Sequence, residues 1–267
     1  MTVPNILSVA GSDPSGGAGV QADIKAISAN GGYAMAALTA LTAQNTMGVR
    51  AVSLIAPGFV ADQIRAVLDD VRVDGVKIGM IGTASIAQAV AGELRAIKAP
   101  IVLDPVMVAK GGDRLLHADA VGALIAHLLP ITDILTPNLP EAGDLLGRPA
   151  PDTQAGMEDC ARALLALGPK AVLLKGGHLE GADSPDLLAS AQGMIWLPGA
   201  RTATKNTHGT GCTLSSALAT QLALTGDRPT AARAAKTYVA RAIAGADRLS
   251  VGRGHGPVDH FHQGDSR

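Results

Sequence analysis

Residues 6–23 read ILSVAGSDPSGGAGVQAD, an apolar run that passes through a glycine-rich loop into a helix-like segment. The run at residues 6–10 is typical of a strand, and the turn residues GSDP at 11–14 close it. Continuous apolar strands that alternate with helices indicate a parallel sheet that is buried on both faces. This first unit therefore predicts an α/β protein.

The same alternation of strands and helices continues along the chain. Strands are expected at residues 52–55, 76–80, 101–104, 134–136 and 171–175, with a hairpin formed by 187–189 and 194–197. Helices are expected after the first loop and at residues 59–71, 83–97, 117–129, 138–147, 153–167, 211–224 and 229–248. The sequence has no internal repeat or linker, so residues 1–267 are predicted to form one domain.

The composition excludes several classes of protein. Only 2% of the 267 residues are aromatic, and the formal net charge is −1. A nucleic-acid binder is not expected, because it needs a basic face and, for single strands, rings that stack on bases. A membrane protein is not expected either, because no run of about 18 apolar residues is present. The two cysteines are too few for a disulfide framework and no secretion signal is recognisable, so a cytoplasmic protein is predicted.

Side chains that directly follow the predicted strands are candidates for a functional site. In open parallel sheets, ligands bind beyond the carboxyl ends of the strands. The side chains at those ends are Asp13, Met80, Asp104, Asn138, Glu141 and Lys175. Asn138 and Glu141 also have the spacing of a helix capping box, so Glu141 has a structural alternative to a metal-binding role.

The first glycine loop contains a dinucleotide-like pattern. Residues 17–22, GAGVQA, fit G-x-G-x-x-G/A. Dinucleotide enzymes also carry an acidic residue about 20 positions further on, and no acidic residue occurs between Asp23 and Asp62. A dehydrogenase is therefore the weakest interpretation.

A second glycine loop, TKNTHGTGCT at residues 204–213, leads directly into an Ala/Leu-rich helix. Gly209, Thr210 and Gly211 would let several backbone N–H groups face one point at the positive end of that helix. Such an anion hole suits the charge on a phosphoryl group during transfer. The alternative is structural, with the glycines forming a turn and Thr210 capping the helix.

Cys212 lies inside this second loop, at a helix N-terminus that is expected to lower the pKa of its thiol. It is therefore a candidate base or nucleophile, although a free cysteine more commonly serves as a small buried apolar residue. Cys160 illustrates that second case, because it shares one helical face with Met157, Leu164 and Leu167.

Taken in order, the motifs of this chain resemble those of the hydroxymethylpyrimidine/phosphomethylpyrimidine kinases of thiamine biosynthesis, which are ribokinase-like. The resemblance rests on AGSDPSGGAG at 10–19, QAD at 21–23, LTAQNT at 41–46, KIGM at 77–80, VLDPVM at 102–107, TPNLPE at 136–141, LKGGH at 174–178, KNTHGTGCT at 205–213 and GHGP at 254–257. It covers essentially the whole chain, and its motifs are specific in combination. It implies a three-layer α/β/α ribokinase-like fold with a central, mostly parallel sheet, in the stand-alone form of the enzyme and as a homodimer.

The resemblance also implies a reaction and a set of site residues. ATP would phosphorylate the hydroxymethyl oxygen of 4-amino-5-hydroxymethyl-2-methylpyrimidine and then the resulting monophosphate. Cys212 would take the alcohol proton beside the anion hole of residues 209–211. The family's pyrimidine contacts correspond to Asp23, Gln44, Met80 and Val106, its nucleotide contacts to Lys175, Asn138 and His208, and its Mg²⁺ ligands, partly through water, to Asp104 and Glu141.

Two alternatives stay open beside this interpretation. A pyridoxal or pyridoxine kinase of the same superfamily acts on a similar small ring with a hydroxymethyl group. A ligand-binding protein that has lost catalysis is less compatible with the intact loop at residues 209–212 and with Lys175, Asp104 and Glu141.

The remaining expectations concern the pocket, a loop and the tail. With so few rings in the chain, the pocket is expected to use Met80, Val106 and backbone, with Gln44 at the ring edge. The loop KGGDR at residues 110–114 is expected to act as a lid. The histidines at positions 255, 260 and 262 are expected to lie in a solvated tail without a role.

Overall fold

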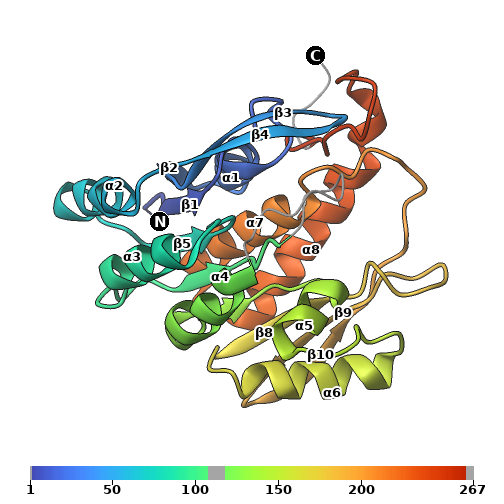
Figure 1. The fold of residues 1–267 in the computed structure, drawn as a ribbon. Coiled ribbons are helices and arrows are strands. Elements are labelled where there is room, and N and C mark those ends of the chain that lie inside the picture. Colours follow the sequence, from blue (N-terminus) through green and yellow to red (C-terminus); the bar gives the residue numbers. More distant parts are fainter. Residues whose placement is uncertain (1, 108–117, 263–267) are drawn as a thin grey trace.

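The computed structural model describes residues 2–107 and 118–262, which form two sheets flanked by helices (Figure 1). The large sheet has the strand order β10-β9-β8-β7-β6-β5-β1-β2. Its strands are β1 (Asn5–Ala10), β2 (Tyr33–Leu38), β5 (Gly75–Ile78), β6 (Ile101–Leu103), β7 (Ile134–Leu135), β8 (Ala171–Lys175), β9 (Asp186–Ser190) and β10 (Gly193–Leu197). The β8–β9 and β9–β10 pairs are antiparallel and the other pairs are parallel, which confirms the predicted architecture.

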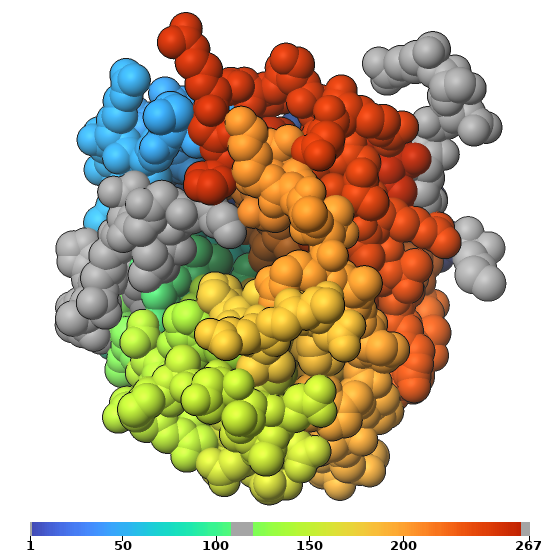
Figure 2. Space-filling view, turned by 90° about the vertical axis from the view of Figure 1, so that its right-hand side faces the viewer, coloured from blue at the N-terminus to red at the C-terminus, as the bar shows by residue number. Residues whose placement is uncertain are grey.

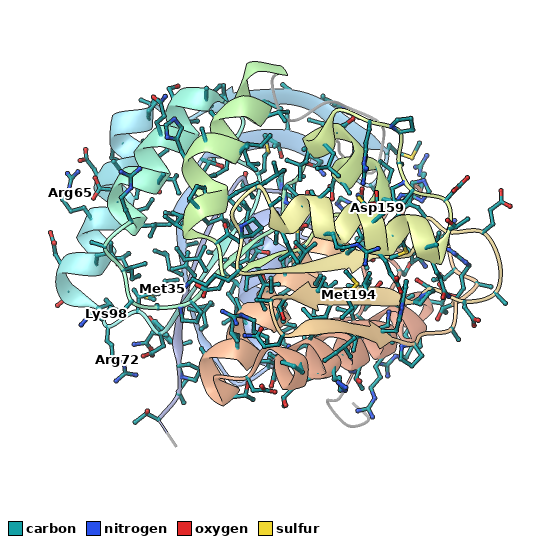
Figure 3. The ribbon with its side chains drawn as sticks, turned by 90° about the horizontal axis from the view of Figure 1, so that it is seen from below. Met35, Arg65, Arg72, Lys98, Asp159 and Met194 are labelled. Atoms are coloured by element: carbon teal, nitrogen blue, oxygen red, sulfur yellow. The ribbon has the colours of Figure 1, made fainter. Side chains whose placement is uncertain are left out.

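Helices cover both faces of this sheet. One face carries α1 (Gly19–Ala29), α7 (Thr210–Thr225) and α8 (Arg228–Ala244), which share a core with Ile6, Val102 and Ile134. The other face carries α2 (Pro57–Asp70), α3 (Ala84–Leu94), α4 (Ala118–Ala123), α5 (Leu139–Leu146) and α6 (Gln154–Leu165). Apolar residues alternate between the two cores along β1, because successive strand residues point to opposite faces. Seen from below, side chains fill both interlayer spaces, whereas Arg65 and Arg72 lie at the periphery (Figure 3).

Some helical segments are irregular or short. A π-helical turn (Leu124–Leu128) and a 3₁₀ turn (Leu129–Ile131) continue the chain after α4, where one helix was predicted at residues 117–129. A further 3₁₀ turn (Ala246–Arg248) follows α8. None of the helices within the described ranges is long and apolar enough to cross a membrane.

A small antiparallel sheet, absent from the predicted set, is formed by β3 (Ala40–Asn45) and β4 (Gly48–Leu54). The strand predicted at residues 52–55 belongs to this hairpin and not to the central sheet. A backbone hydrogen bond from Ser12 N to Ala40 O (2.9 Å) ties the hairpin to the loop after β1. The hairpin therefore lies next to the first glycine loop.

The five aromatic side chains are spread over the molecule. Tyr33, Phe59 and Phe261 are more than half exposed, and Tyr238 is buried on α8. Trp196 is half-buried on the edge strand β10, where its Nε1–H donates to Glu158 Oε1 of α6 (3.3 Å).

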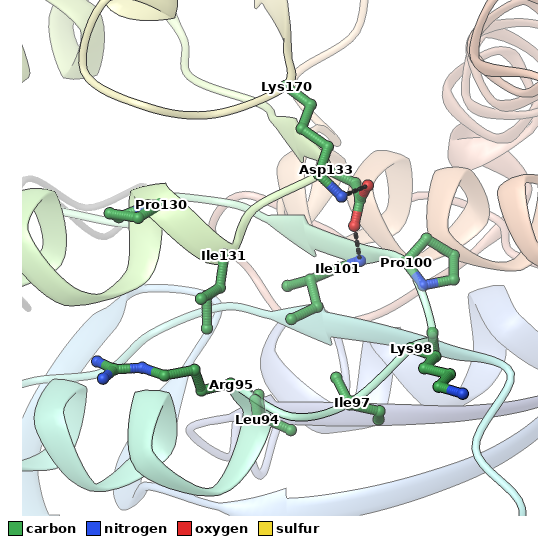
Figure 4. A pocket seen from close by; sticks show the side chains of 11 residues that line it. Leu94, Arg95, Ile97, Lys98, Pro100, Ile101, Pro130, Ile131, Asp133 and Lys170 are labelled. Atoms are coloured by element: carbon green, nitrogen blue, oxygen red, sulfur yellow. Dashed lines mark hydrogen bonds and ion pairs between the residues drawn. The ribbon is translucent and has the colours of Figure 1, made fainter.

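A hollow of about 300 Å³ lies at the amino ends of the central strands (Figure 4). Ile101, Asp133 and Lys170 line it, and each stands at the start of β6, β7 or β8. The side chains predicted to form a site follow the carboxyl ends of the same strands, at the opposite edge of the sheet. The hollow is therefore separate from the predicted site.

Candidate active site

The two glycine loops meet at the start of α7. Gly209 is the N-cap residue of this helix and has φ of +76°. Residues other than glycine rarely adopt this backbone conformation. A Cβ atom at Gly209 would stand only 1.8 Å from the carbonyl oxygen of Gly17 in the first loop. The close approach of these two loops therefore requires glycine at position 209.

The first turn of α7 has no side-chain cap. The Thr210 hydroxyl donates backward to the carbonyl oxygen of Thr207 (2.8 Å), so the predicted alternative of a Thr210 cap is wrong. Thr210 N also donates to the carbonyl oxygen of Thr207 (3.3 Å), and the following amide groups of this turn keep the partial positive charge of the helix end. This is the local chemistry of an anion hole.

Lys175 and Asp104 lie directly against this turn. A Cβ at Gly211 would be 3.2 Å from Asp104 Oδ2 and 3.4 Å from Lys175 Nζ. Lys175 Nζ donates to Asp104 Oδ1 (3.0 Å), which also accepts from the Thr136 hydroxyl (3.2 Å). Burial alone would lower the pKa of Lys175, but the carboxylates of Asp104 and Glu141 outweigh it and raise that pKa. The lysine is therefore a fixed cation beside the helix end.

Glu141 makes the predicted capping box. Its Oε2 accepts from Asn138 N (2.8 Å), and Asn138 Oδ1 accepts from Glu141 N (2.8 Å). The same Oε2 lies 3.8 Å from Lys175 Nζ. Burial raises the pKa of Glu141 to about 7, with Lys175 opposing the shift and Asp104 adding to it.

Asp104 and Glu141 are the residues that would hold Mg²⁺. No cluster of three or more metal-binding side chains occurs in the part of the chain that the structure describes. Mg²⁺ usually keeps several waters and needs only one or two carboxylates together with phosphate oxygens. Asp104 Oδ2, which faces Gly211 and accepts no hydrogen bond from a described residue, fits that requirement, and Glu141 is its acidic neighbour across Lys175.

Cys212 is half-buried in the first turn of α7. Burial raises the pKa of its thiol to about 11, although the Lys77 ammonium acts in the opposite direction. The predicted lowering of this pKa is therefore wrong, because loss of water outweighs the field of the helix end. Cys160 is 1% exposed in the core, as predicted.

Asp23 lies in a buried network beneath Cys212. Its carboxylate accepts from Lys77 Nζ (2.8 and 2.9 Å), the Ser8 hydroxyl (2.6 Å) and the Ser216 hydroxyl (2.8 Å). Asp23 and Lys77 are both 0% exposed. Burial alone would lower the pKa of Lys77, but Asp23 outweighs it and raises that pKa, so Lys77 stays a cation. The predicted contact of Asp23 with the pyrimidine stays a prediction.

The imidazole of His208 is also buried. Its Nε2 lies 2.7 Å from Asp13 Oδ2, and its ring packs so tightly on Gly17 that a Cβ there would be 2.4 Å from Cδ2. Burial acts to raise the pKa of Asp13, but hydrogen bonds from His208 and Ser15 outweigh it and hold that pKa at about 2. His208 thus links the two glycine loops, and its contact with a nucleotide stays a prediction.

The predicted pyrimidine contacts come from three elements near the first loop. Gln44 is half-buried on β3, and its Oε1 accepts from the Thr42 hydroxyl (3.3 Å). Met80 follows β5 and is 8% exposed, with its sulfur 2.9 Å from where a Cβ on Gly11 would stand. Val106 is half-buried after β6. The predicted lid at residues 110–114 lies outside the described residues.

Sequence reasoning missed two parts of this region. Lys77 could have been noticed as a lysine inside an otherwise apolar strand, a position that requires a buried counter-ion. The C-terminal segment was predicted to be solvated, yet His260 is 4% exposed and Val258 is fully buried. That prediction is therefore wrong for His260.

Known kinases are similar to this chain in sequence over nearly its whole length. The family model described as phosphomethylpyrimidine kinase matches residues 13–259. The hydroxymethylpyrimidine/phosphomethylpyrimidine kinases of Salmonella typhimurium and Escherichia coli are 51% and 49% identical, each over 97% of both chains.

Solved structures of two kinds of kinase are similar to the chain. The Bacillus subtilis pyridoxal kinase in complex with ADP has a TM-score of 0.90 and 32% identity, covering 98% of this chain and 99% of its own. The phosphomethylpyrimidine kinase from Clostridium difficile has a TM-score of 0.79 and 39% identity, covering 91% of this chain and 100% of its own.

Proposed function

The chain belongs to the phosphomethylpyrimidine kinase family, and from this premise we propose the reaction that it catalyses. It transfers the γ-phosphoryl group of ATP to the hydroxymethyl oxygen of 4-amino-5-hydroxymethyl-2-methylpyrimidine, and then phosphorylates that monophosphate to the diphosphate. The product serves thiamine biosynthesis. The observation that carries the proposal is the uncapped start of α7 with Lys175 and Asp104 against Gly211.

The anion hole supplies most of the stabilisation in this proposal. Phosphoryl transfer passes through a loose transition state, so the protein acts mainly by positioning and by electrostatic stabilisation. The amide groups of Gly209, Thr210 and Gly211 would face the oxygens of the moving phosphoryl group, and Lys175 would neutralise the phosphates. A Mg²⁺ ion held near Asp104 and Glu141 would shield the phosphate charge.

Cys212 is proposed to accept the proton of the hydroxymethyl group. A pKa of about 11 leaves the thiol protonated at neutral pH, so only a small thiolate fraction is available. The positive charge of Lys77 favours the thiolate, and the hydrogen bonds of Lys77 to Asp23 would hold the ammonium group in place. Because the proton leaves late in a loose transition state, a scarce base is compatible with turnover.

The pyrimidine pocket is proposed to use Met80, Val106 and Gln44. None of the five aromatic residues belongs to the motifs that contribute these side chains. A methionine sulfur against a flat ring gives a favourable contact, and the Gln44 amide offers both a donor and an acceptor. Gln44 therefore suits a ring nitrogen beside an exocyclic amine.

Pyridoxal phosphorylation is the second candidate, favoured by the TM-score of 0.90 with a pyridoxal kinase. The test is ADP release with ATP, Mg²⁺ and each alcohol in turn. We expect the kcat/KM for the pyrimidine to be at least about tenfold above that for pyridoxal, because a few contacts at the ring edge can discriminate by that much. Turnover of pyridoxal alone would refute the substrate assignment, and turnover of neither would favour a binding protein.

A cytoplasmic homodimer completes the proposal. The β3–β4 hairpin exposes Leu41 (46%), Met47 (71%), Val52 (42%) and Leu54 (39%), an apolar surface that a second copy could cover. Light scattering of Val52→Glu should show monomer where the unmodified protein shows dimer. The free state of both cysteines fits a reducing compartment.

A further inference from the structure

The C-terminal segment at residues 254–260, here called the strap, touches two parts of the site that are distant in sequence. In Figure 2 the red C-terminal part of the chain, to which the strap belongs, lies between the blue region of the hairpin and the orange region that precedes α7. The strap follows the 3₁₀ turn after α8. The proposed reaction does not use the two histidines of the strap, His255 and His260.

The first contact of the strap is with the tip of the hairpin, at Thr46. His255 N donates to the carbonyl oxygen of Thr46 (3.0 Å), and Gly254 N donates to its hydroxyl (3.2 Å). A Cβ at Gly254 would stand 2.0 Å from the same carbonyl oxygen, so the two backbones are too close for any side chain at position 254. Thr46 is two residues from Gln44 on the same hairpin.

The second contact is with the loop that enters the anion hole. Gly256 N donates to Asn206 Oδ1 (3.1 Å), and His208 N donates to Gly256 O (3.0 Å). Pro257 forms a parallel bridge with His208, immediately before Gly209. One short segment therefore holds both the hairpin and the loop.

The strap has its own anchor. Val258 is 0% exposed, and Asp259 N donates to Ala242 O of α8 (2.9 Å). His260 Nε2 lies 3.0 Å from the hydroxyl of Thr213, which donates to Gly209 O (2.8 Å). The anchor thus fixes the strap to the first turn of α7 independently of the hairpin contact.

We propose that the strap is a positioning element that sets the distance between the hairpin carrying Gln44 and the anion hole at residues 209–211. A small aromatic alcohol must present its hydroxymethyl oxygen at the anion hole while its ring edge is held at Gln44. Both ends of that span are tied to residues 254–257, and the anchor that follows them contacts α7 and α8. This proposal rests on the proposed pyrimidine kinase activity.

The test is the Gly254→Ala variant. The added methyl group must open the contact with Thr46 O from 2.0 Å to the 3.4 Å of ordinary contact, while the anchor stays intact. A displacement of about 1 Å at a substrate-positioning group is enough for a large loss, so the KM for the pyrimidine should rise at least about tenfold. The KM for ATP should stay within about twofold, because the loop side of the strap is unchanged.

Gly92→Ala is the matched control, because Gly92 lies on α3 and its added Cβ would meet no described residue beyond the backbone of its own helix within 4 Å. Tryptic cleavage after the exposed Arg50 on β4 gives a second readout, and it should accelerate in Gly254→Ala but not in Gly92→Ala. This cleavage tests the strap even if the unmodified protein does not phosphorylate the pyrimidine. A folded Gly254→Ala protein with unchanged pyrimidine KM and cleavage would overturn the proposal, as would equal increases in both KM values.

If Gly254→Ala does not fold, Thr46→Val and Thr46→Ser replace it. Valine removes the acceptor for Gly254 N, and serine retains it. A raised pyrimidine KM in Thr46→Val that Thr46→Ser restores would support the strap. An unchanged KM in Thr46→Val would refute it.

Discussion

Replacing Gly209 by alanine perturbs the contact on which the anion hole is built. The new Cβ would be 1.8 Å from the carbonyl oxygen of Gly17, so the two loops must separate until the contact reaches about 3.4 Å. A misplacement of about 1 Å can cost about 10²-fold, so kcat should fall at least about 10²-fold, or about 2.7 kcal/mol in the barrier. The φ of +76° adds about 1–2 kcal/mol of destabilisation for a side chain.

The assay for Gly209→Ala is ADP release at saturating substrates, with thermal unfolding measured in parallel. Gly211→Ala is a graded comparison, because its Cβ would meet the Asp104 carboxylate at 3.2 Å and side chains can yield. Its kcat should therefore fall less, by about tenfold or under. Gly92→Ala should leave kcat unchanged. Near-normal kcat and unfolding temperature in Gly209→Ala would refute the tight apposition of the two loops.

Three further predictions concern Cys212, Lys175 and His260. Cys212→Ala should lower kcat by about 10²–10⁴-fold with little change in pyrimidine KM, and unchanged turnover would make Cys212 structural. In the unmodified enzyme, kcat should rise with pH above 7. Lys175→Met should lower kcat by about 10²–10³-fold and raise the KM for ATP, measured by initial rates, whereas a retained ATP KM would contradict phosphate binding by Lys175. Burial lowers the pKa of His260 to about 4, so the unfolded state binds more protons than the native state between about pH 6.5 and 4. The free energy of unfolding should therefore fall by about 3 kcal/mol as pH drops through that window. Urea unfolding at several pH values would measure this fall in the unmodified protein and in His260→Gln.

The central sheet could be predicted because its strands are short apolar runs with clear turn residues. β5, β6 and β8 are buried on both faces, and their sequences consist mainly of apolar residues. β2 and β3 were missed because residues 33–45 are rich in alanine and threonine, which have no decisive period. The pairing of β2 with β1 joins residues 28 positions apart, Asn5 and Tyr33, whereas β3 and β4 pair locally as a hairpin.

The site residues divide in the same way. Asp104 and Lys175 were identified from their place after strands, and the structure brings them together against Gly211. The sign of the Cys212 shift could not be predicted, because it depends on how much water the fold removes from the thiol. Nor could the burial of Asp23, since its partner Lys77 lies 54 positions away in the sequence.

The isolated position of Trp196 makes the protein a useful optical system. Its indole lies on the edge strand β10 beside Glu158, two strands away from β8 and Lys175. A change in the indole emission on adding a ligand would therefore report motion at the sheet edge, and not quenching by a ring stacked on the indole. A second tryptophan in place of exposed Leu41 would give the hairpin a separate signal, so that the two ends of the molecule could be followed in one titration.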